Sequence, residues 1–357
     1  MKVVSCRPAW RQTSNRFTQL FSEAVQQSGW TVREFSWGWH GLFAPRVVLI
    51  HWPGEMLTPS KLGERAKVLS KLALLHFARN VLRTRFVWLV HETQPHDDIR
   101  TVRWSTRSFL SALDGTIYLS HASRRVSIAD IPDLAKIPYL VTRHGHYRKD
   151  LETAEQPRRS PGQRLELVYF GQIRPYKNLD GLIRAASKID PDAMRIRIVG
   201  WSKDSAFTHE LEALAKDAPA ISLDIRDTYV PQVDLEDAIN SSDGVVLPYR
   251  NILNSGAALL ALSCNRPVLA PRLGSLPELQ DEIGRDWVSL YDGDINESHL
   301  RNFDDALRRA DRDVVDMPLY EWPLVGESIG EFLDQLSTGG ATVRASDPNA
   351  EAEHTWR

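Results

Sequence analysis

The chain has 357 residues, and at about 150 residues per domain this length predicts two domains. Hydrophobic residues make up 42% of the chain and charged residues 25%, which are the values of a soluble globular protein. Because no apolar run reaches about eighteen residues, the composition excludes a membrane-spanning helix. A secretory signal is not expected either, since the N-terminus passes directly into a predicted strand.

Charge is distributed unevenly along the chain. Of the 44 basic and 46 acidic residues, 22 and 11 fall within residues 1–150, so this half has a balance of +11 and the remainder −13. A basic first half suits an anionic partner such as a membrane, a phospholipid-like acceptor or nucleic acid, and a merely solvated surface is the alternative. The two cysteines, Cys6 and Cys264, lie in distant apolar segments, which indicates a reducing cytoplasm and no disulfide framework.

The first half alternates apolar runs of β-forming residues with helical periods. In chain order, the pattern predicts a strand at 2–5, a helix at 17–27, strands at 31–35 and 47–51, a long helix at 62–82, a strand at 86–91, a helix at 105–113, and strands at 115–119 and 137–141. Such alternation predicts a parallel sheet with helices on both faces.

The polar, Pro-rich and Gly-rich segment 151–163 is the predicted linker, and the alternation then restarts. Strands are predicted at 165–170, 195–199, 221–224, 244–247 and 267–270, with helices at 179–188, 207–215, 235–240 and 255–263. The last twenty residues, 338–357, are small, polar and charged, and we expect a disordered tail.

We therefore expect an α/β protein with two Rossmann-like doubly wound domains facing a cleft, at 1–155 and 164–335. Parallel α/β sheets bind ligands at the carboxyl ends of their strands. Several chemically informative residues directly follow predicted strands, namely His51, His91, His144, Arg174, Lys177, Trp201, Tyr249 and Ser255.

Two segments of the second half are typical of phosphate binding. The first, Leu167-Val-Tyr-Phe-Gly-Gln-Ile-Arg174-Pro-Tyr-Lys177, is a strand that ends in glycine and leads to two cations before a helix. Arginine offers a fork of donors and lysine a point charge, so the pair can cover both phosphates of a diphosphate. A solvated loop with incidental charges is the alternative.

The second segment opens a helix with Ser255-Gly256-Ala. Small residues there let phosphate oxygens approach the bare N–H groups of the first turn, and the helix dipole favours negative charge. The helix stops near Asn265, which can take the left-handed conformation before Pro267. A plain N-cap of a buried helix is the alternative.

With these motifs in place, the second half resembles the nucleotide-binding domain of the GT-B glycosyltransferases, in their glycogen-synthase-like group. Segments 170–178 and 255–268 are similar to a bacterial exopolysaccharide branch that includes xanthan-type β-mannosyltransferases. Segments 50–53, 90–96 and 143–147 of the first half agree with this resemblance.

The resemblance implies a metal-independent hexosyltransferase without a cofactor, whose co-substrate is a nucleotide diphosphate sugar. GDP-mannose is the first expectation for the donor and a UDP-sugar the second, and the acceptor is a saccharide or a polyprenol-diphosphate-linked saccharide. It places Arg174 and Lys177 on the donor diphosphate, with Ser255 and Gly256 facing it. Preorganised cations and helix dipoles then stabilise the departing diphosphate in place of a divalent ion.

The chain departs from the family pattern in two places. Two glutamates of the larger group fall on Ile252 and Leu260, so the usual ribose contact is missing and a retaining outcome cannot be inferred. The common Gly-Arg pair after the strand is Gly171-Gln172 here, with the arginine displaced to Arg174.

The acid–base residue is expected in the loop 91–98 of the first domain. His91, Asp97 and Asp98 are the candidate catalytic groups, because transfer to a hydroxyl needs an imidazole or carboxylate within reach. Other polar side chains are expected to line the cleft on the acceptor side, namely His51, Glu92, His144 and His146.

Two further groups of residues complete the expected site. Trp201, Tyr229 and Tyr249 follow strands near the nucleobase and ribose region and can stack on the base, or belong to the core. His144-Gly-His146 lacks a third ligand at zinc spacing, so no metal is expected. Asp292-Gly-Asp294 precedes a polar helix and is interpreted as a turn and cap.

Residues 61–85 contain seven basic residues and one glutamate, with apolar residues at helical spacing. This pattern suits docking on an anionic membrane surface, which would place a cytoplasmic protein on the inner face of the plasma membrane, or packing of an ordinary amphipathic helix on the sheet. Three other functions stay open: a nucleotide-sugar epimerase on the same fold, a catalytically inactive nucleotide-binding scaffold, and a nucleic-acid binder, which lacks known motifs.

Overall fold

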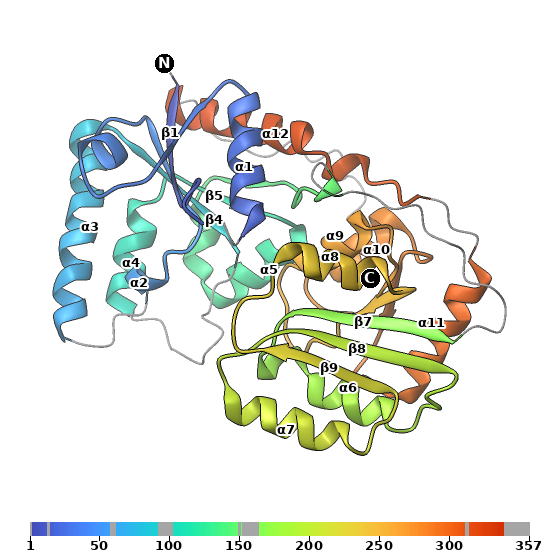
Figure 1. Ribbon diagram of the computed structural model, residues 1–357. Coiled ribbons are helices and arrows are strands. Elements are labelled where there is room, and N and C mark those ends of the chain that lie inside the picture. Colours follow the sequence, from blue (N-terminus) through green and yellow to red (C-terminus); the bar gives the residue numbers. More distant parts are fainter. Residues whose placement is uncertain are drawn as a thin grey trace. The chain divides into compact units, whose positions relative to one another are not determined.

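The computed structural model describes residues 2–12, 15–57, 62–91, 103–148, 151, 164–310 and 314–338 (Figure 1). The chain forms two compact units, Met1–Gly145 with Leu319–Arg357, and His146–Pro318. The division therefore lies at 145 and the segment after 318 belongs to the first unit, whereas the sequence placed residues up to 335 in the second. Most of the predicted linker and the predicted tail lie outside the described residues.

The first unit is built on a six-stranded sheet in the order β2-β1-β3-β4-β5-β6, in which each neighbouring pair is parallel. Parallel pairing is what the strand and helix alternation predicts. The strands are β1 (Val3–Arg7), β2 (Thr31–Glu34), β3 (Val47–Ile50), β4 (Arg85–Val90), β5 (Gly115–Tyr118) and β6 (Tyr139–Val141).

Helices cover both faces of this sheet (Figure 1). Buried residues of α3 and α4 pack on the face that carries Val48, Phe86 and Trp88, whereas α12 packs under β5, where a Cβ on Gly115 would lie 2.8 Å from Leu336. The helices are α1 (Arg16–Gln27), α2 (Gly54–Leu57), α3 (Leu62–Leu82), α4 (Arg103–Ala112), α5 (His121–Asp130) and α12 (Trp322–Thr338), with a π-turn η1 (Trp39–Phe43) and a 3₁₀ turn η2 (Pro132–Lys136).

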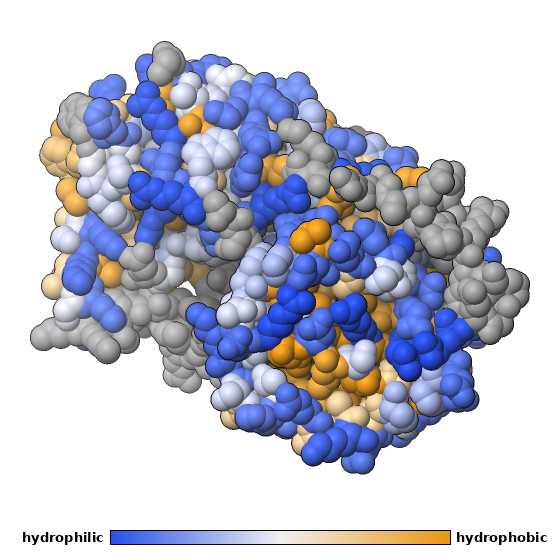
Figure 2. All heavy atoms as spheres, in the orientation of Figure 1, coloured by the Kyte–Doolittle hydropathy of each residue, from blue (hydrophilic) through white to orange (hydrophobic). Residues whose placement is uncertain are grey.

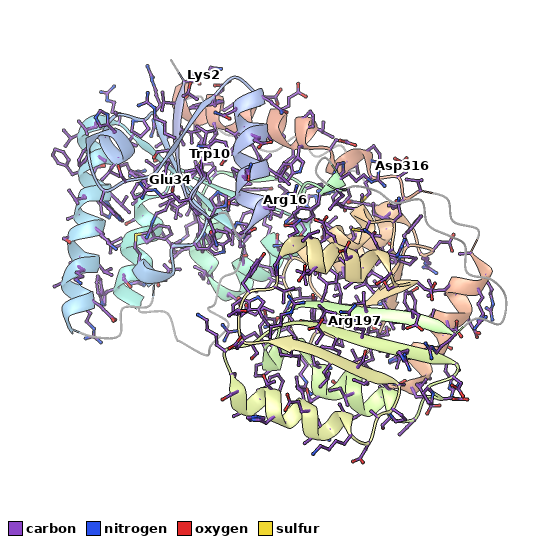
Figure 3. The ribbon with its side chains drawn as sticks, viewed as in Figure 1. Lys2, Trp10, Arg16, Glu34, Arg197 and Asp316 are labelled. Atoms are coloured by element: carbon purple, nitrogen blue, oxygen red, sulfur yellow. The ribbon has the colours of Figure 1, made fainter. Side chains whose placement is uncertain are left out.

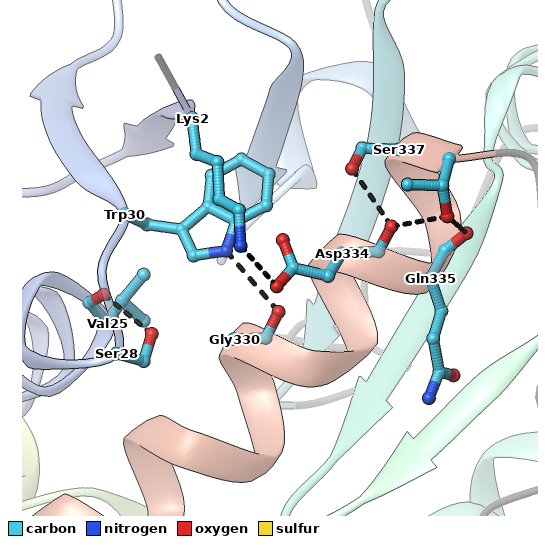
Figure 4. A network of polar contacts seen from close by, with 9 residues as sticks. Lys2, Val25, Ser28, Trp30, Gly330, Asp334, Gln335 and Ser337 are labelled. Carbon is cyan, nitrogen blue, oxygen red and sulfur yellow. Dashed lines mark hydrogen bonds and ion pairs between the residues drawn. The ribbon is translucent and has the colours of Figure 1, made fainter.

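Helix α12 is joined to the start of the chain by polar contacts and close packing (Figure 4). The Lys2 ammonium lies 2.5 Å from Asp334, and the Trp30 indole N–H donates to the carbonyl of Gly330 at 3.3 Å. A Cβ on Gly326 would come within 2.3 Å of the Ala24 carbonyl oxygen, so only glycine permits this approach of α12 to α1. The last helix therefore belongs to the core of the first unit.

The second unit contains another six-stranded parallel sheet, in the order β12-β11-β10-β7-β8-β9. Two parallel Rossmann-like sheets confirm the predicted fold class. The strands are β7 (Leu165–Gln172), β8 (Met194–Trp201), β9 (Ile221–Arg226), β10 (Gly244–Val246), β11 (Val268–Pro271) and β12 (Val288–Tyr291).

Helices again lie on both sides, with α6 and α7 on one face and α8, α9 and α10 on the other (Figure 1). The helices are α6 (Leu179–Ala186), α7 (Ser205–Ala215), α8 (Gln232–Asn240), α9 (Gly256–Ser263), α10 (Leu276–Ile283) and α11 (Glu297–Arg309), with 3₁₀ turns η4 (Pro175–Lys177) and η5 (Pro318–Tyr320). Asn265 has a φ of 53°, which confirms the left-handed residue predicted after the α9 helix.

Candidate active site

The first predicted phosphate segment forms a tight strand-to-helix connection in the second unit. Strand β7 ends at Gly171 and Gln172, and Gly171 has a φ of 115° that favours glycine. A Cβ on the neighbouring Gly200 of β8 would lie 2.0 Å from the Gly171 carbonyl oxygen, so two glycines allow the strands to meet here. The turn η4 follows, and Asn178 enters α6 with a left-handed φ of 57°.

The Arg174 side chain is held by the residue that replaces the family arginine. With its amide oxygen toward the guanidinium, Gln172 accepts hydrogen bonds from Nε and Nη2 of Arg174, each at 3.1 Å. The Tyr169 hydroxyl in turn donates to the Gln172 carbonyl at 2.9 Å, which fixes the backbone at this point. Because the planar guanidinium is oriented by two bonds, its remaining donors have a defined direction.

Lys177 lies against aromatic rings and makes no ion pair with any of the described residues. Its Nζ is 3.9 Å from the centroid of the Tyr249 ring and 5.0 Å from that of Tyr176, which is the geometry of a cation–π contact. Burial lowers the pKa of Lys177 to about 8. A half-buried ammonium that lies on ring faces is well suited to bind an anion.

The second predicted phosphate segment is the N-terminus of α9. Ser255 is the extended N-cap, and its Oγ accepts a hydrogen bond from the Ala258 N–H at 3.1 Å. Gly256 is the first helical residue, so no bulky side chain covers the first turn. Both the N-cap and the small-residue opening agree with the sequence pattern.

Tyr249 brings the two segments to the same place. Its ring carries the Lys177 ammonium, and its phenol lies beside the Ser255 hydroxyl, which acts against the rise in pKa that burial causes in Tyr249. The Arg250 N–H donates to the Tyr176 carbonyl at 2.9 Å, which ties the two loops together. Tyr249 is only 3% exposed, so its ring is a buried surface on which the Lys177 ammonium lies.

The other two aromatic candidates lie at the ends of adjacent strands. Trp201 ends β8, and Tyr229 follows β9, with ring centroids 6.2 Å apart in an edge-on arrangement. Tyr229 is 45% exposed. The two positions of the missing glutamates hold Ile252 and the buried Leu260, and neither supplies a charge.

The first unit contains a second group of predicted residues, which we call the histidine cluster. It surrounds the carboxyl ends of β3, β4 and β6 and consists of Phe17, Phe21, His51, Trp52, His91, His144 and Trp322. His51 Nδ1 lies 3.1 Å from His91 Nε2, and His144 Nδ1 lies 2.8 Å from the Gly145 carbonyl oxygen. The structure thus brings together three of the predicted histidines.

Packing against aromatic rings keeps these histidines neutral. The Phe17 ring centroid is 4.4 Å from that of His144 and 5.2 Å from that of His91, and Trp52 stacks on His91 at 4.6 Å. Burial lowers the pKa of His51 to about 3 and that of His144 to about 4. Burial and the neighbouring His51 and His144 hold the pKa of His91 well below its ordinary value.

The remaining candidates are not in this cluster. His146 belongs to the second unit, where its Nδ1 accepts a hydrogen bond from the Arg148 N–H at 3.2 Å. Glu92, Asp97 and Asp98 lie outside the described residues. Around Asp292 the chain bends, with Gly293 at a φ of 74°, but the expected cap is wrong, since Asn296 caps the following helix α11.

Sequence reasoning missed several contacts between distant residues of the first unit. The Glu34 carboxylate accepts hydrogen bonds from the backbone N–H groups of Ala9, Trp10 and Arg11 at 3.1, 2.7 and 3.1 Å, which fixes the loop after β1 (Figure 3). Trp322 lies about 300 residues after Phe17 in the sequence, and no local sequence pattern predicts the contact between their rings.

The described residues contain no group of three or more His, Cys, Asp and Glu side chains arranged to hold a metal ion. No helix within the described ranges combines the length and apolarity that crossing a bilayer requires.

The known proteins and the protein family with similar sequences are glycosyltransferases. The model of the family described as glycosyl transferases group 1 matches residues 164–298. A GDP-mannose:glycolipid 4-beta-D-mannosyltransferase from Xanthomonas campestris pv. campestris is 33% identical over 336 residues, which span 92% of this chain and 90% of that protein.

Solved structures share the architecture at much lower identity. A sucrose-phosphate synthase from Thermosynechococcus elongatus aligns with a TM-score of 0.61 at 11% identity, over 94% of this chain and 95% of that one. Anabaena Alr3699/HepE, solved in complex with UDP, aligns with a TM-score of 0.57 at 15% identity, over 95% and 98%. These structures have the same fold, which agrees with the two parallel sheets.

Proposed function

This chain belongs to the group 1 glycosyltransferases of the GT-B fold, and we propose that it transfers mannose from GDP-mannose to a lipid-linked saccharide. It is a nucleotide-sugar glycosyltransferase, and the proposed sugar and acceptor follow the activity named for the Xanthomonas relative. The observation that carries the donor site is the meeting of Lys177 and the α9 N-terminus at Tyr249, with Arg174 oriented by Gln172 in the same turn as Lys177.

In this proposal the second unit binds the donor diphosphate. The ordered fork of Arg174 and the ammonium of Lys177 contact phosphate oxygens, and Ser255 and Gly256 present the first N–H groups of α9. As the bond between the sugar and the diphosphate breaks, negative charge grows on the leaving group. Fixed cations and N–H dipoles stabilise that charge without a metal ion. Trp201 and Tyr229, on neighbouring strand ends, contact the nucleobase.

The first unit supplies the acceptor side. His51, His91 and His144 form one cluster there, and Glu92, Asp97 and Asp98 follow in the same loop of the sequence as His91. One of these groups accepts the proton of the attacking hydroxyl. His146, in the second unit, is proposed to contact the acceptor as well.

The donor proposal is tested by thermal-shift titration with GDP, UDP, ADP and dTDP and with their sugars. A ligand that binds only the native state raises its apparent melting temperature. We expect a shift with GDP-mannose that Arg174→Ala/Lys177→Ala abolishes. The matched control is Lys188→Ala/Arg195→Ala, which removes one lysine and one arginine exposed on the same unit. A shift with UDP alone would make a UDP-sugar the donor in place of GDP-mannose. No shift with any nucleotide would refute the donor site.

Transfer itself separates the enzyme from its rivals. GDP-[¹⁴C]mannose is incubated with polyprenol-diphosphate-linked oligosaccharides, and the lipid fraction is counted. We expect label in that fraction only with wild-type protein. Donor turnover without acceptor would support an epimerase, and donor binding without any product would support an inactive scaffold.

The acceptor's lipid requires a membrane-facing surface, and α3 provides a suitable one. Apolar side chains point outward from it, with Leu69 at 57%, Phe77 at 51% and Val81 at 61% exposure. At 100° per residue they fall on the side opposite the buried Leu72 and Leu75. Figure 2 shows apolar surface along the outer side of this helix.

Cations flank this apolar stripe on both sides. The helical positions of Lys67 and Lys71 fall along one border, and that of Arg65 falls along the other. Apolar residues at the centre of the exposed face, with cations at its edges, are the pattern of a helix that lies in the interface of an anionic bilayer. We propose this helix as the membrane contact.

The membrane contact is tested by flotation with phosphatidylcholine vesicles that contain or lack phosphatidylglycerol. Wild type is expected to float only with the anionic vesicles and to be released by salt. Leu69→Ser/Phe77→Ser should stay in solution, whereas the control Val233→Ser, which removes an exposed valine from α8, should float like wild type. Flotation that ignores salt and the α3 substitutions would overturn the assignment.

A further inference from the structure

The hydrogen bond of His144 determines which of its ring nitrogens carries a proton. Nδ1 lies 2.8 Å from the Gly145 carbonyl oxygen, and a carbonyl can only accept. Nδ1 must therefore donate. A neutral imidazole holds one proton, so Nε2 of His144 has an unshared pair and is a proton acceptor.

The contact between His51 and His91 has two possible directions, and burial distinguishes them. His51 is 1% exposed, and its Nε2 has no hydrogen-bond partner among the described residues. If His91 donated through Nε2, His51 would hold a buried N–H at Nε2 with no acceptor, and such orphaned donors are rare. If His51 donates through Nδ1, only an unshared pair is buried. The second direction is favoured.

This direction fixes the proton of His91. Since Nε2 of His91 accepts from His51, its own proton is on Nδ1. Nδ1 makes no hydrogen bond within the described part of the chain, and the His91 side chain is only partly buried. His91 therefore presents a donor, whereas His144, also partly buried, presents an acceptor. Phe17 lies between the two rings and packs against both.

We propose that His144 Nε2 takes the proton of the attacking acceptor hydroxyl, that His91 Nδ1–H donates a hydrogen bond to the acceptor sugar, and that His51 positions His91. This inference rests on the proposed transfer function and corrects the sequence-based preference for His91 as the base. It assigns a separate role to each histidine of the cluster.

The proton and electrons balance in this step. The hydroxyl O–H bond breaks as its proton passes to His144 Nε2, and the oxygen forms a bond to the anomeric carbon of the donor. The bond from that carbon to the diphosphate breaks, and the leaving group keeps the electron pair. The imidazolium then loses its proton to solvent, which restores the neutral ring.

The role of His144 is tested with His144→Asn. The asparagine amide can donate to the Gly145 carbonyl in place of Nδ1, but it has no basic nitrogen. We expect kcat to fall by about 10²–10⁴-fold, the usual worth of a general base, while GDP-mannose raises the melting temperature as in wild type. Added imidazole should restore part of the activity of His144→Ala. Activity of His144→Asn within a few-fold of wild type would overturn the assignment.

The role of His51 is tested with two substitutions of opposite polarity. Asparagine keeps a donor near the Nδ1 position, whereas aspartate only accepts and would force the His91 proton onto Nε2. We expect His51→Asn to keep the acceptor KM near that of wild type and His51→Asp to raise it. Equal effects of both substitutions would refute a tautomer-setting role.

Nitrogen-15 spectra of the histidine rings give a readout that needs no variant. The wild-type protein should show a neutral His91 protonated at Nδ1 and a neutral His144 protonated at Nδ1. A His91 ring protonated at Nε2 would refute the inference directly. Because these spectra require no donor, they distinguish its failure from failure of the GDP-mannose proposal, which is seen as absence of transfer by wild type.

Discussion

The two units prepare polar groups for chemistry in opposite ways. In the second unit, Lys177 keeps a positive charge on the faces of two tyrosine rings, and its pKa falls to about 8 because burial disfavours that charge. In the first unit, aromatic packing keeps His51, His91 and His144 uncharged. The same kind of side chain, an aromatic ring, therefore surrounds a cation in one place and neutral bases in the other.

The difference follows from the side chains that surround the Lys177 ammonium and those that surround the three imidazoles. A ring face attracts an ammonium through its quadrupole, so Lys177 remains charged near neutrality despite desolvation. The histidines pack against the rings of Phe17, Phe21 and Trp52 and against one another. A half-buried cation is prepared for an anionic ligand, whereas neutral imidazoles are prepared to move protons and bind hydroxyl groups.

The largest effect is expected when the positive charge of Lys177 is removed. Lys177→Met keeps the length of the side chain but removes its charge. We expect kcat for transfer to fall by about 10²–10³-fold, as when one preorganised group that stabilises a leaving charge is removed. Steady-state kinetics with GDP-mannose measure it, and Lys203→Met is the control on the same unit. A loss of less than a few-fold would mean that Lys177 does not meet the diphosphate.

The neutral histidines predict acid sensitivity of the first unit. Their folded pKa values lie below the unfolded value of about 6.5, so at intermediate pH the unfolded chain binds more protons. Stability is therefore expected to fall as pH falls from about 6.5 toward about 4, by about 1.4 kcal/mol per pH unit for each proton taken up. Urea unfolding across this range measures the slope.

The control for this slope removes one buried imidazole. His51→Asn deletes one titrating group, so the slope between pH 6 and pH 4 should decrease by about one proton equivalent. An unchanged slope would show that His51 is not the group that resists protonation.

The cap of α9 has a smaller expected effect. Ser255→Ala removes the hydroxyl that accepts from the Ala258 N–H, and loss of an N-cap costs about 1 kcal/mol. The melting temperature should fall slightly, and affinity for GDP should fall with it if the hydroxyl also meets phosphate. Asn296 caps α11 in the same way, so Asn296→Ala is the matched control. Equal GDP affinity in the two variants would argue against a donor role for Ser255.

Much of the fold could be predicted from the sequence because the strand signals are local. The long helix at 62–82 matches α3, and the Ser255 cap and the left-handed Asn265 follow from residue type alone. Helix α5 was missed because its sequence is mostly polar and its start depends on a Ser120–Ser123 capping box. These elements are decided by short-range geometry.

The parts that the sequence did not predict depend on contacts between distant residues. The return of α12 to the first unit rests on Trp30 meeting Gly330, and on a glycine at 326 against Ala24. Likewise, Tyr249 was expected near the base, but only the tertiary structure shows it under Lys177. The roles of the three histidines follow from which atoms their rings face, and a sequence carries no record of that.

The smallest effect, and the sharpest test of the comparison, is proton uptake when the donor binds. Free Lys177 has a pKa of about 8, so it is charged below that pH and loses its proton above it. A bound diphosphate favours the charged form and raises this pKa. Binding at pH 8.5 should therefore take up a fraction of one proton, whereas binding at pH 6.5 should take up almost none from this group.

Calorimetry in buffers of different ionisation enthalpy measures that uptake. The observed binding enthalpy at pH 8.5 should depend on the buffer in wild type and lose this dependence in Lys177→Met, while His51→Asn should behave like wild type. A buffer dependence that survives Lys177→Met would assign the proton to another group. If instead His51→Asn removed it, the histidines would be coupled to donor binding, and the separation of charged and neutral sites would fail.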